Sequence, residues 1–151
     1  MEDLSLHILD VVENSIEAAA TKIEIRITED KIRDLLEIEI KDNGRGMTEQ
    51  TLSKVLDPFY TTRTTRRVGM GLSLLAQASK ESNGNFEINS AVGIGTEVKA
   101  SFQHSHIDRK PMGDIKSTLI SLMISYPDIN IIFVYQDEEG TDTLDSNQLK
   151  Q

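Results

Sequence analysis

"DNGRGM", residues 42–47, is the stretch that decides the fold. The run "LLEIEIK" directly before it places an apolar side chain at every second position, which is the period of a strand with one buried face. The acid and the two glycines end this strand, and their spacing is not that of a two-residue hairpin turn. A hydrogen-bond acceptor beside two flexible backbone positions, followed by a methionine, indicates a binding loop.

The chain around this loop alternates between helical and strand periods. Before it, "LSLHILDVVENSIEAAA" has a helical apolar face and "KIEIRIT" alternates as a strand. After it come a short helix that Thr48 caps, a segment without an apolar period, a further helix and a final hairpin. In chain order we expect these elements at residues 4–20, 22–28, 35–41, 48–56, 58–69, 71–82 and 85–103. This order predicts an α/β fold, a two-layer sandwich with helices on one face of a mixed, mostly antiparallel sheet.

A polar stretch, "HSHIDRKPMG", divides the chain into a first domain, residues 1–105, and an extension, residues 106–151. The extension contains an amphipathic helix, the strand candidate "INIIFVY" and the acidic, polar tail "QDEEGTDTLDSNQLKQ". It has no glycine pair, metal cluster or isolated reactive side chain. We therefore expect it to serve contact, either as an interface, as an added strand at the sheet edge or as a cover for the sheet.

Composition excludes several classes of function. Sixteen Lys and Arg against twenty-five Asp and Glu give a net charge of -9, which argues against a nucleic-acid partner. The absence of cysteine excludes disulfides, thiolate metal sites and cysteine nucleophiles. No apolar run is long enough to span a membrane, and the acidic start lacks the basic region of a signal peptide. A soluble, cytoplasmic protein is the expectation.

Polar side chains gather on one face of the first helix. Asp10, Asn14 and Glu17 follow one another at spacings of four and three, which places them side by side. A solvated face is the simplest interpretation of the acids. Asparagine is a mediocre helix former, however, and its amide suits a specific hydrogen bond or a metal contact.

Glycine pairs mark three positions, at residues 44 and 46, 69 and 71, and 93 and 95. The second pair stands directly before a helix, where exposed backbone amides attract phosphate. None of the pairs fits the Walker or the Rossmann pattern, and each alone is compatible with an ordinary turn.

Four stretches together are far more specific. In their order and spacing, "ENSIEAA", "DNGRGM", "VGMGLSLL" and "GIGTEV" resemble the N, G1, G2 and G3 boxes of the GHKL superfamily, over roughly residues 4–103. That group holds gyrase, the ninety-kilodalton heat-shock chaperone, histidine kinases and the mismatch-repair MutL proteins. "DPFYTTR" resembles the F box of histidine kinases, whereas "VVENSIEAAATKIEI" is more similar to the mismatch-repair branch. The resemblance implies the Bergerat fold, with ATP and Mg²⁺ as cofactors.

The resemblance also implies a role for each residue of these boxes. Asp42 would accept a hydrogen bond from the adenine amino group, directly and through a water held by Thr96. Asn14 would offer its carboxamide oxygen to a magnesium ion that bridges the phosphates. The other residues expected to bind ATP are Gly44, Gly46 and Met47 around the adenine, Gly69, Gly71 and Leu72 around the phosphates, and Arg63 in the lid. Two more lid arginines, Arg66 and Arg67, either add to this anion site or are ordinary surface charge.

One departure from the superfamily affects catalysis. Hydrolytic members carry a glutamate four residues before the magnesium asparagine, and this chain has Asp10 there. Aspartate reaches ~1 Å less far, and a displacement of that size can cost about a hundredfold in rate. Asp10 is still the expected catalytic residue, since Glu13 lies off that face. His7 shares the face with Asp10 and Asn14, either with a catalytic role or as a locally hydrogen-bonded or surface histidine.

Three functions fit the sequence. The first is a stand-alone, histidine-kinase-like domain that uses ATP for phosphotransfer to, or switching of, a protein partner. The short lid and the "PFYTTR" box favour it, although the first helix follows Met1 so closely that no hairpin with a phosphoacceptor histidine is expected before it. The second is a slow ATPase with a lid-driven conformational change, which Asp10 and "VVENSIEAAA" favour. The third is a nucleotide-binding interaction module without turnover. Paired nucleotide sites can be coupled, so a homodimer is also an option.

Overall fold

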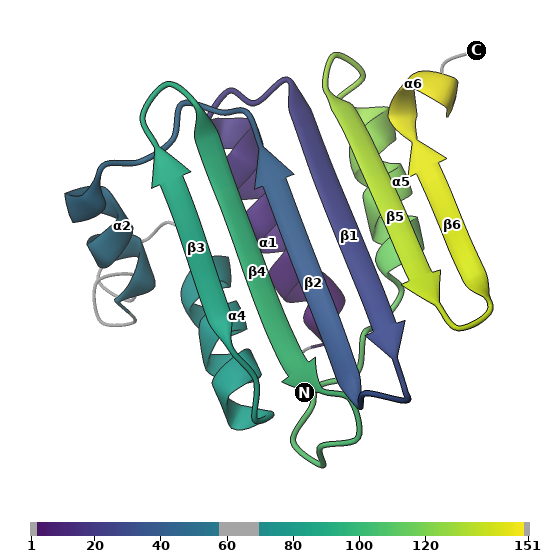
Figure 1. Ribbon diagram of the computed structural model, residues 1–151. Coiled ribbons are helices and arrows are strands. Elements are labelled where there is room, and N and C mark those ends of the chain that lie inside the picture. Colours follow the sequence, from purple (N-terminus) through teal and green to yellow (C-terminus); the bar gives the residue numbers. More distant parts are fainter. Residues whose placement is uncertain (1–2, 58–69, 150–151) are drawn as a thin grey trace.

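A computed structural model describes residues 3–57 and 70–149 of the chain. Within them, helices cover one face of a six-stranded sheet whose strand order is β3-β4-β2-β1-β5-β6 (Figure 1). All neighbouring strands are antiparallel except β1 and β5, which are parallel. The elements are α1 (Leu4–Glu17), β1 (Lys22–Asp30), β2 (Leu35–Asp42), α2 (Glu49–Leu56), α4 (Met70–Glu81), β3 (Phe86–Ala91), β4 (Gly95–Gln103), α5 (Ile115–Ser125), β5 (Asn130–Asp137), β6 (Gly140–Asp145) and α6 (Ser146–Leu149). The predicted fold class is confirmed.

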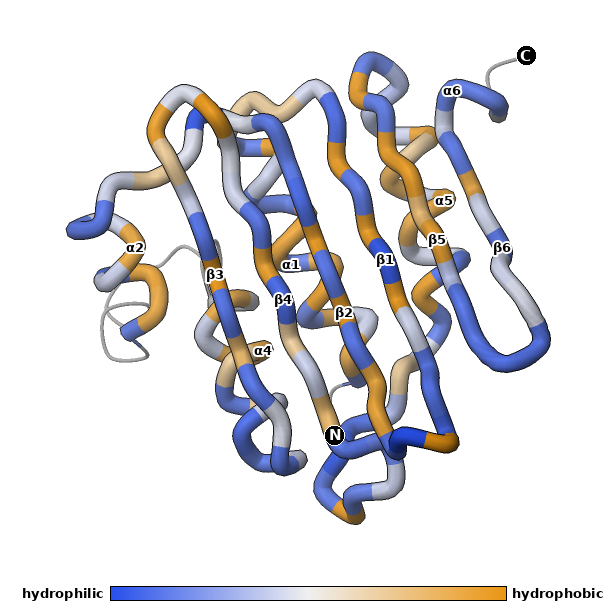
Figure 2. Tube along the Cα trace, in the orientation of Figure 1, coloured by the Kyte–Doolittle hydropathy of each residue, from blue (hydrophilic) through white to orange (hydrophobic). Residues whose placement is uncertain are grey.

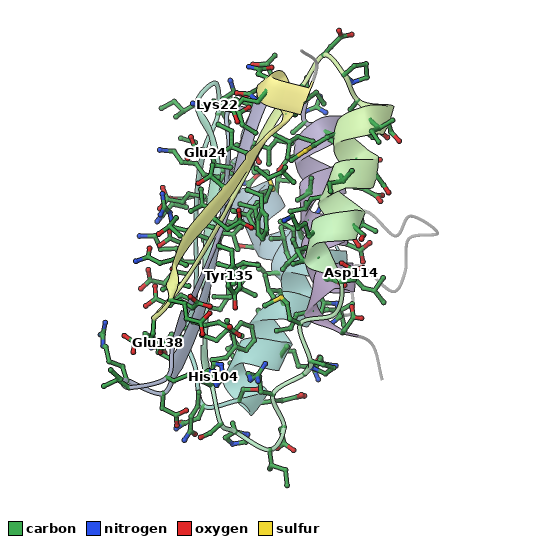
Figure 3. The ribbon with its side chains drawn as sticks, turned by 90° about the vertical axis from the view of Figure 1, so that its right-hand side faces the viewer. Lys22, Glu24, His104, Asp114, Tyr135 and Glu138 are labelled. Carbon is green, nitrogen blue, oxygen red and sulfur yellow. The ribbon has the colours of Figure 1, made fainter. Side chains whose placement is uncertain are left out.

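The apolar core lies between the sheet and the three long helices α1, α4 and α5 (Figure 3). Alternating isoleucines of β1 and β2 point into this layer, and Figure 2 shows the same alternation as bands along the strands. Ile25 faces Ile40 across the two strands, and both are buried. Each fully buried side chain of this size contributes about 1.5–3 kcal/mol to folding, so the strand period alone favours this face.

The other face of the sheet carries charges in alternating rows. Arg26, Glu39, Lys99 and Glu87 lie side by side on β1, β2, β4 and β3, so every charge has neighbours of opposite sign. Cross-strand pairs of this kind each contribute roughly 0.2–1 kcal/mol. This face can therefore contact water without a covering layer. None of the helices in the described part of the chain is both long and apolar enough to cross a bilayer.

The helix α1 is shorter than its sequence pattern predicts. It ends at Glu17, and Ala19 has a positive φ of 62°. The carbonyl oxygen of Ala18 accepts a hydrogen bond from the backbone N–H of Arg45, at 2.8 Å, and so is taken by the loop after β2. At the other end, Asp3 caps the helix by accepting a hydrogen bond from the N–H of Leu6.

The extension shares its core with the rest of the molecule. Strand β5 pairs with β1 so that Phe133 lies beside Ile25. Leu119 and Met123 of α5 belong to the same buried cluster as the isoleucines of β1. Residues 106–149 therefore cover apolar surface of the sheet.

The end of the chain differs from the expected polar tail. Residues 140–145 form β6, which pairs antiparallel with β5, and α6 follows. The turn is closed by Asp137, which accepts a hydrogen bond from the N–H of Glu139 at 2.8 Å. Ser146 then accepts a bond from the N–H of Ile131 at 2.8 Å. Backbone pairing with β5 thus makes a strand from a sequence with little apolar content.

A strap of residues 104–114 connects β4 to α5 and passes the start of α1. The N–H groups of Leu4 and Ser5 donate to the carbonyl oxygens of Pro111 and Met112, both at 2.8 Å. First-turn amides have no partner within their own helix, so these two bonds hold α1 against the strap. Asp34 fixes the start of the strap by accepting bonds from the backbone and the hydroxyl of Ser105.

We expect truncation after His104 to cause aggregation, because it removes Leu119, Met123 and Phe133 from the shared core. Light scattering and far-UV circular dichroism would measure the effect. Truncation after Ser146 is the matched control, since Asn147 and Gln148 are exposed, and it should leave a soluble protein. A soluble, natively folded 1–104 fragment would contradict the shared core.

A second test uses the link between β1, β5 and the strap. The Tyr135 hydroxyl donates to Glu29, whose other carboxylate oxygen lies 3.4 Å from Nε2 of His104. Burial, with the bond to Glu29 next in size, raises the pKa of Tyr135 above its ordinary value of 10.0. An unfolded chain therefore loses this proton at a lower pH than the folded protein does. The protonated Tyr135 hydroxyl therefore stabilises the folded state fully below about pH 10, and this contribution is lost as the pH rises further.

The free energy of unfolding should therefore fall less steeply above pH 10 in Tyr135→Phe than in the parent. At pH 7 the variant should be less stable by about 0.5–1.5 kcal/mol, the net contribution of one hydrogen bond. Urea titrations at several pH values would give both numbers. Tyr126→Phe, at an exposed position, is the control. Parallel pH curves for Tyr135→Phe and the parent would disprove this account.

Candidate functional site

A cavity of about 200 Å³ opens where α1, the loop after β2, α4 and β4 meet. It joins residues that are far apart in the sequence. Asn14 comes from α1, Asp42 from the end of β2, Leu72 from the first turns of α4 and Thr96 from the start of β4. Its lining residues are Val11, Asn14, Ser15, Glu17, Ala18, Ile40, Asp42, Arg45, Gly46, Met47, Val55, Leu72, Thr96 and Val98. The four sequence boxes thus converge on one cavity.

Asp42 has a fixed carboxylate. One of its oxygens accepts a hydrogen bond from the Ser15 hydroxyl at 2.6 Å, and the other accepts one from the N–H of Gly44 at 2.8 Å. Thr96 faces Asp42 across the β2–β4 pair, and their water-mediated contact with adenine stays a prediction. Because both oxygens are already oriented, the carboxylate presents a defined acceptor to the cavity.

Sequence reasoning missed Ser15. Its hydroxyl lies 2.6 Å from Asp42, and the residue itself is buried, with 3% of its surface exposed. The available signal was its position: a serine at a core-facing position of a helix needs a hydrogen-bond partner. The partner is 27 residues away, which the helix pattern cannot show.

Ser90 is a second missed residue. Its Oγ accepts a hydrogen bond from the N–H of Met47 at 2.8 Å and lies 2.8 Å from Oγ1 of Thr96. It also donates to the carbonyl oxygen of Gly95 at 3.2 Å. One hydroxyl thereby connects the loop after β2 to both arms of the β3–β4 hairpin.

Three glycines of the boxes, Gly44, Gly46 and Gly71, are needed for close contacts within the protein. Gly46 has a φ of +73°, and a Cβ there would lie 2.0 Å from the carbonyl oxygen of Ala91. A Cβ at Gly71 would lie 2.6 Å from the Cβ of Asp10, so α4 approaches α1 closely at this point. Gly44 is also buried against Ala18. The expected contacts of these glycines with a nucleotide stay predictions.

Arg45 and Asn43 fix the loop from outside. The guanidinium of Arg45 donates to the carbonyl oxygen of Glu17, at the C-terminal end of α1, where a positive charge is favourable. Asn43 accepts hydrogen bonds from the N–H groups of Thr21 and Lys22, at 2.8 and 3.0 Å. The loop therefore has one well-defined position relative to α1 and β1.

The remaining predicted residues are placed as follows. Asp10 and Asn14 are both half-buried, and Asn14 lines the cavity, whereas Glu13 is exposed. His7 is 1% exposed, so it is a buried residue and the surface alternative is wrong. Four residues lie outside the described part of the chain: Arg63, Arg66, Arg67 and Gly69.

A larger hollow of about 430 Å³ lies beside this cavity, by the open face of the sheet, and shares Asp42 and Thr96 with it. Lys22 and Glu24 in its wall form an ion pair of 3.3 Å, and both point away from the helices (Figure 3). Among the residues that the structure describes, none from α1 or α4 lines it. The smaller cavity, which Asn14 and Leu72 do line, is therefore the candidate site.

Known proteins match this chain as follows. Residues 2–106 match the family described as Histidine kinase-, DNA gyrase B-, and HSP90-like ATPase. The sensor histidine kinase YxdK of Bacillus subtilis is 35% identical over 106 residues, covering 66% of this chain and 32% of that protein. Sporulation kinase C of the same organism is 31% identical over 88 residues, which cover 58% of this chain and 20% of that protein. The solved ATPase domain of Aquifex aeolicus MutL, complexed with ADP, has a TM-score of 0.54 at 23% identity, covering 95% of this chain and 62% of that one.

The chain belongs to the family of histidine kinase-, DNA gyrase B- and HSP90-like ATPases, since the match spans more than half of its length. The predicted superfamily is thus confirmed. The likeness to MutL shows that the two proteins share a fold. This chain spans about a third or less of the histidine kinases it matches.

Asp42→Asn should weaken adenine-nucleotide binding by roughly 1–3 kcal/mol, because it replaces one acceptor oxygen with a donor. Ser15→Ala should weaken it less, by about 1 kcal/mol, since Asp42 keeps its bond to Gly44. Calorimetric titration would measure both. Glu39→Gln, on the open face of the same strand, is the control. Unchanged affinity in Asp42→Asn would show that Asp42 does not recognise adenine.

Proposed function

We propose that this protein binds magnesium-ATP as a histidine-kinase-like domain and uses it for phosphotransfer to, or switching of, a protein partner. The convergence of Asn14, Asp42 and Thr96 on one cavity is the observation that carries the proposal. Membership of an ATPase family supports it, and the similarity to bacterial sensor and sporulation kinases favours phosphotransfer.

The cavity suits the two ends of a nucleotide differently. Asp42, Met47 and Val98 give one part an oriented acceptor and apolar walls, as an adenine ring requires. The start of α4 supplies helix-start amides, which phosphates require, and Asn14 supplies a carboxamide oxygen for the cation that accompanies them. The expected binding residues are those of the four boxes together with Arg63.

Asn14 is the residue that would hold magnesium. It is half-buried and lines the cavity. One hard oxygen from the protein, with phosphate and water oxygens completing the shell, is a common arrangement for magnesium in nucleotide sites. When bound, the ion neutralises charge on the phosphates and orients them.

A slow ATPase is the second candidate, and the position of Asp10 favours it. Asp10 is half-buried, four residues before Asn14, and lies against Gly71 at the start of α4. A carboxylate there could accept a proton from an attacking water. A module that binds nucleotide without turnover is the third candidate.

The proposal includes the wider setting of the protein. We take residues 1–105 as the nucleotide-binding unit, which the family match to residue 106 supports, and residues 106–151 as an extension that contacts the sheet. The net charge of -9 favours a protein partner, or a second copy of the chain, over nucleic acid. A cytoplasmic location remains part of the same proposal.

Incubation with γ-labelled ATP would separate the candidates. The protein should bind magnesium-ATP with micromolar to millimolar affinity, and Asn14→Ala should lose at least tenfold in affinity while ATP without magnesium is little affected. Glu13→Gln, its exposed neighbour, is the control. Label on protein supports phosphotransfer, and free phosphate supports hydrolysis. No calorimetric signal with millimolar ATP or ADP would remove the whole proposal.

A further inference from the structure

Helix α5 lies at the outer flank of the helical layer, with α1 between it and α4 (Figure 1). Its inner face packs into the core through Ile115, Leu119, Leu122 and Met123. At helical spacing, the opposite side of α5 is formed by Ser117, Ile120, Ser121 and Ile124. On this outer face Ile124 is 74% exposed and Ile120 is half-buried. A helix that is apolar on both sides is typical of a buried position, yet one side of α5 is uncovered.

The outer face of α5 also lacks charge. The chain has twenty-five acidic residues and a net charge of -9, but no charged residue occurs from Ser117 to Pro127. The positions between the isoleucines hold serines, which are exposed. Small side chains beside larger apolar ones allow a second helix to approach closely and to pack ridge into groove. This face is therefore suited to a helix from another molecule.

Two opposite charges lie at the ends of this face. Lys116 is in the first turn of α5, and Asp128 follows its C-terminal end; both residues are exposed. Lys116 lies 3.4 Å from Asp142 of β6, and each of these two side chains is more than half exposed. Such an exposed pair contributes little to stability, so Lys116 can contact another acid at low cost.

The arrangement is complementary to itself. When two copies of α5 pack antiparallel about a two-fold axis, the start of each helix meets the end of the other. Lys116 of one copy then lies opposite Asp128 of the second, and Ile120 lies opposite Ile124. Both pairs are centred on the same turn of the helix, so one axis satisfies both.

The open edge of the sheet is a poorer surface for a second copy. Strand β6 is the edge strand, and two β6 strands side by side would bring Asp142 and Asp145 of both copies together. Like charges in neighbouring strands are destabilising. The outer face of α5 carries no such acids, so two copies of this acidic chain can approach each other there.

We propose that the outer face of α5 is a dimer interface, and that it holds the α5 of a second copy of this chain in antiparallel orientation. Burial of Ile120 and Ile124 supplies the free energy, and the Lys116–Asp128 pairs set the orientation. A stable complex buries about 1,200–2,000 Å² in total, more than one pair of three-turn helices provides, so the dimer is weak and reversible. Among the described residues, none of α5 lines the candidate nucleotide cavity, so the inference does not depend on the proposed function.

Sedimentation equilibrium without nucleotide would test the interface. The parent should form a dimer with a micromolar to millimolar dissociation constant, and Ile124→Glu should raise this constant about tenfold or more, because each dimer would bury two unpaired carboxylates. Glutamate is a good helix former and position 124 is exposed, so the fold should persist. Ile107→Glu is the matched control: it makes the same change at a 94% exposed isoleucine of the strap and should leave the constant within about twofold.

Charge reversal would test the orientation. Lys116→Glu should weaken the dimer several-fold, and the double variant Lys116→Glu, Asp128→Lys should recover it, since the pair is restored with its signs exchanged. Asp142→Asn is the control, because it removes the partner of Lys116 within the same molecule and should not weaken the dimer.

A covalent trap gives an independent arm. The chain contains no cysteine, so a single introduced thiol is unambiguous. Ser121→Cys lies near the proposed two-fold axis, where the two Cα atoms come within the reach of a disulfide, about 7 Å or less. Mild oxidation should therefore link two copies rapidly in Ser121→Cys and far more slowly in Ile107→Cys.

The results separate this inference from the proposed function. A parent that stays monomeric at millimolar concentration, or a dimer that Ile124→Glu does not weaken, would overturn the interface. A dimer that Ile124→Glu weakens but Ser121→Cys does not trap would overturn the antiparallel arrangement. Magnesium-ATP affinity should stay within about twofold in Ile124→Glu. Absence of ATP binding by the parent would overturn only the proposed function.

Discussion

The loop of residues 42–47 holds the site together, because one hexapeptide is bonded to three other segments. Asp42 accepts a bond from Ser15 of α1, Asn43 accepts bonds from the start of β1, and Met47 donates to Ser90 of β3. Arg45 donates from its guanidinium to the carbonyl oxygen of Glu17 and from its backbone N–H to that of Ala18, both at the end of α1. The part of the cavity wall that this loop forms is therefore in position before any ligand binds, which lowers the entropy that binding has to offset.

The sheet could be predicted from sequence because one of its faces contacts solvent, so apolar and polar residues alternate along its strands. The alternation of Ile23, Ile25 and Ile27 with polar residues predicts both the strand and the face that it buries. Element ends could not be predicted in the same way. The end of α1 depends on a bond from Arg45, and β6 depends on pairing with β5. Both are partnerships between distant segments, which a local period does not record.

The site was predictable where the chemistry needs an uncommon residue in a fixed order, as with Asn14 and Asp42. Ser15 and Ser90 were not predicted, because serine is common and its role depends on the hydrogen-bond partner of its hydroxyl. The glycines were found, but the reason given for them was incomplete. Gly46 and Gly71 are required by Ala91 and Asp10 of the protein itself. Such a motif therefore reflects packing as well as ligand contact.

Helix α1 is the fixed part of this arrangement. The strap bonds its first turn, the loop after β2 bonds its last turn, and the sheet, α4 and α5 pack along its sides. A conformational change would have to break several of these contacts to move α1, so it is more easily accommodated elsewhere. Helix α2 has no fully buried residue, yet its Val55 lines the cavity. A ligand would thus contact a weakly anchored helix on one side and a firmly anchored one on the other, and from this difference in anchoring we expect α2, not α1, to respond to binding.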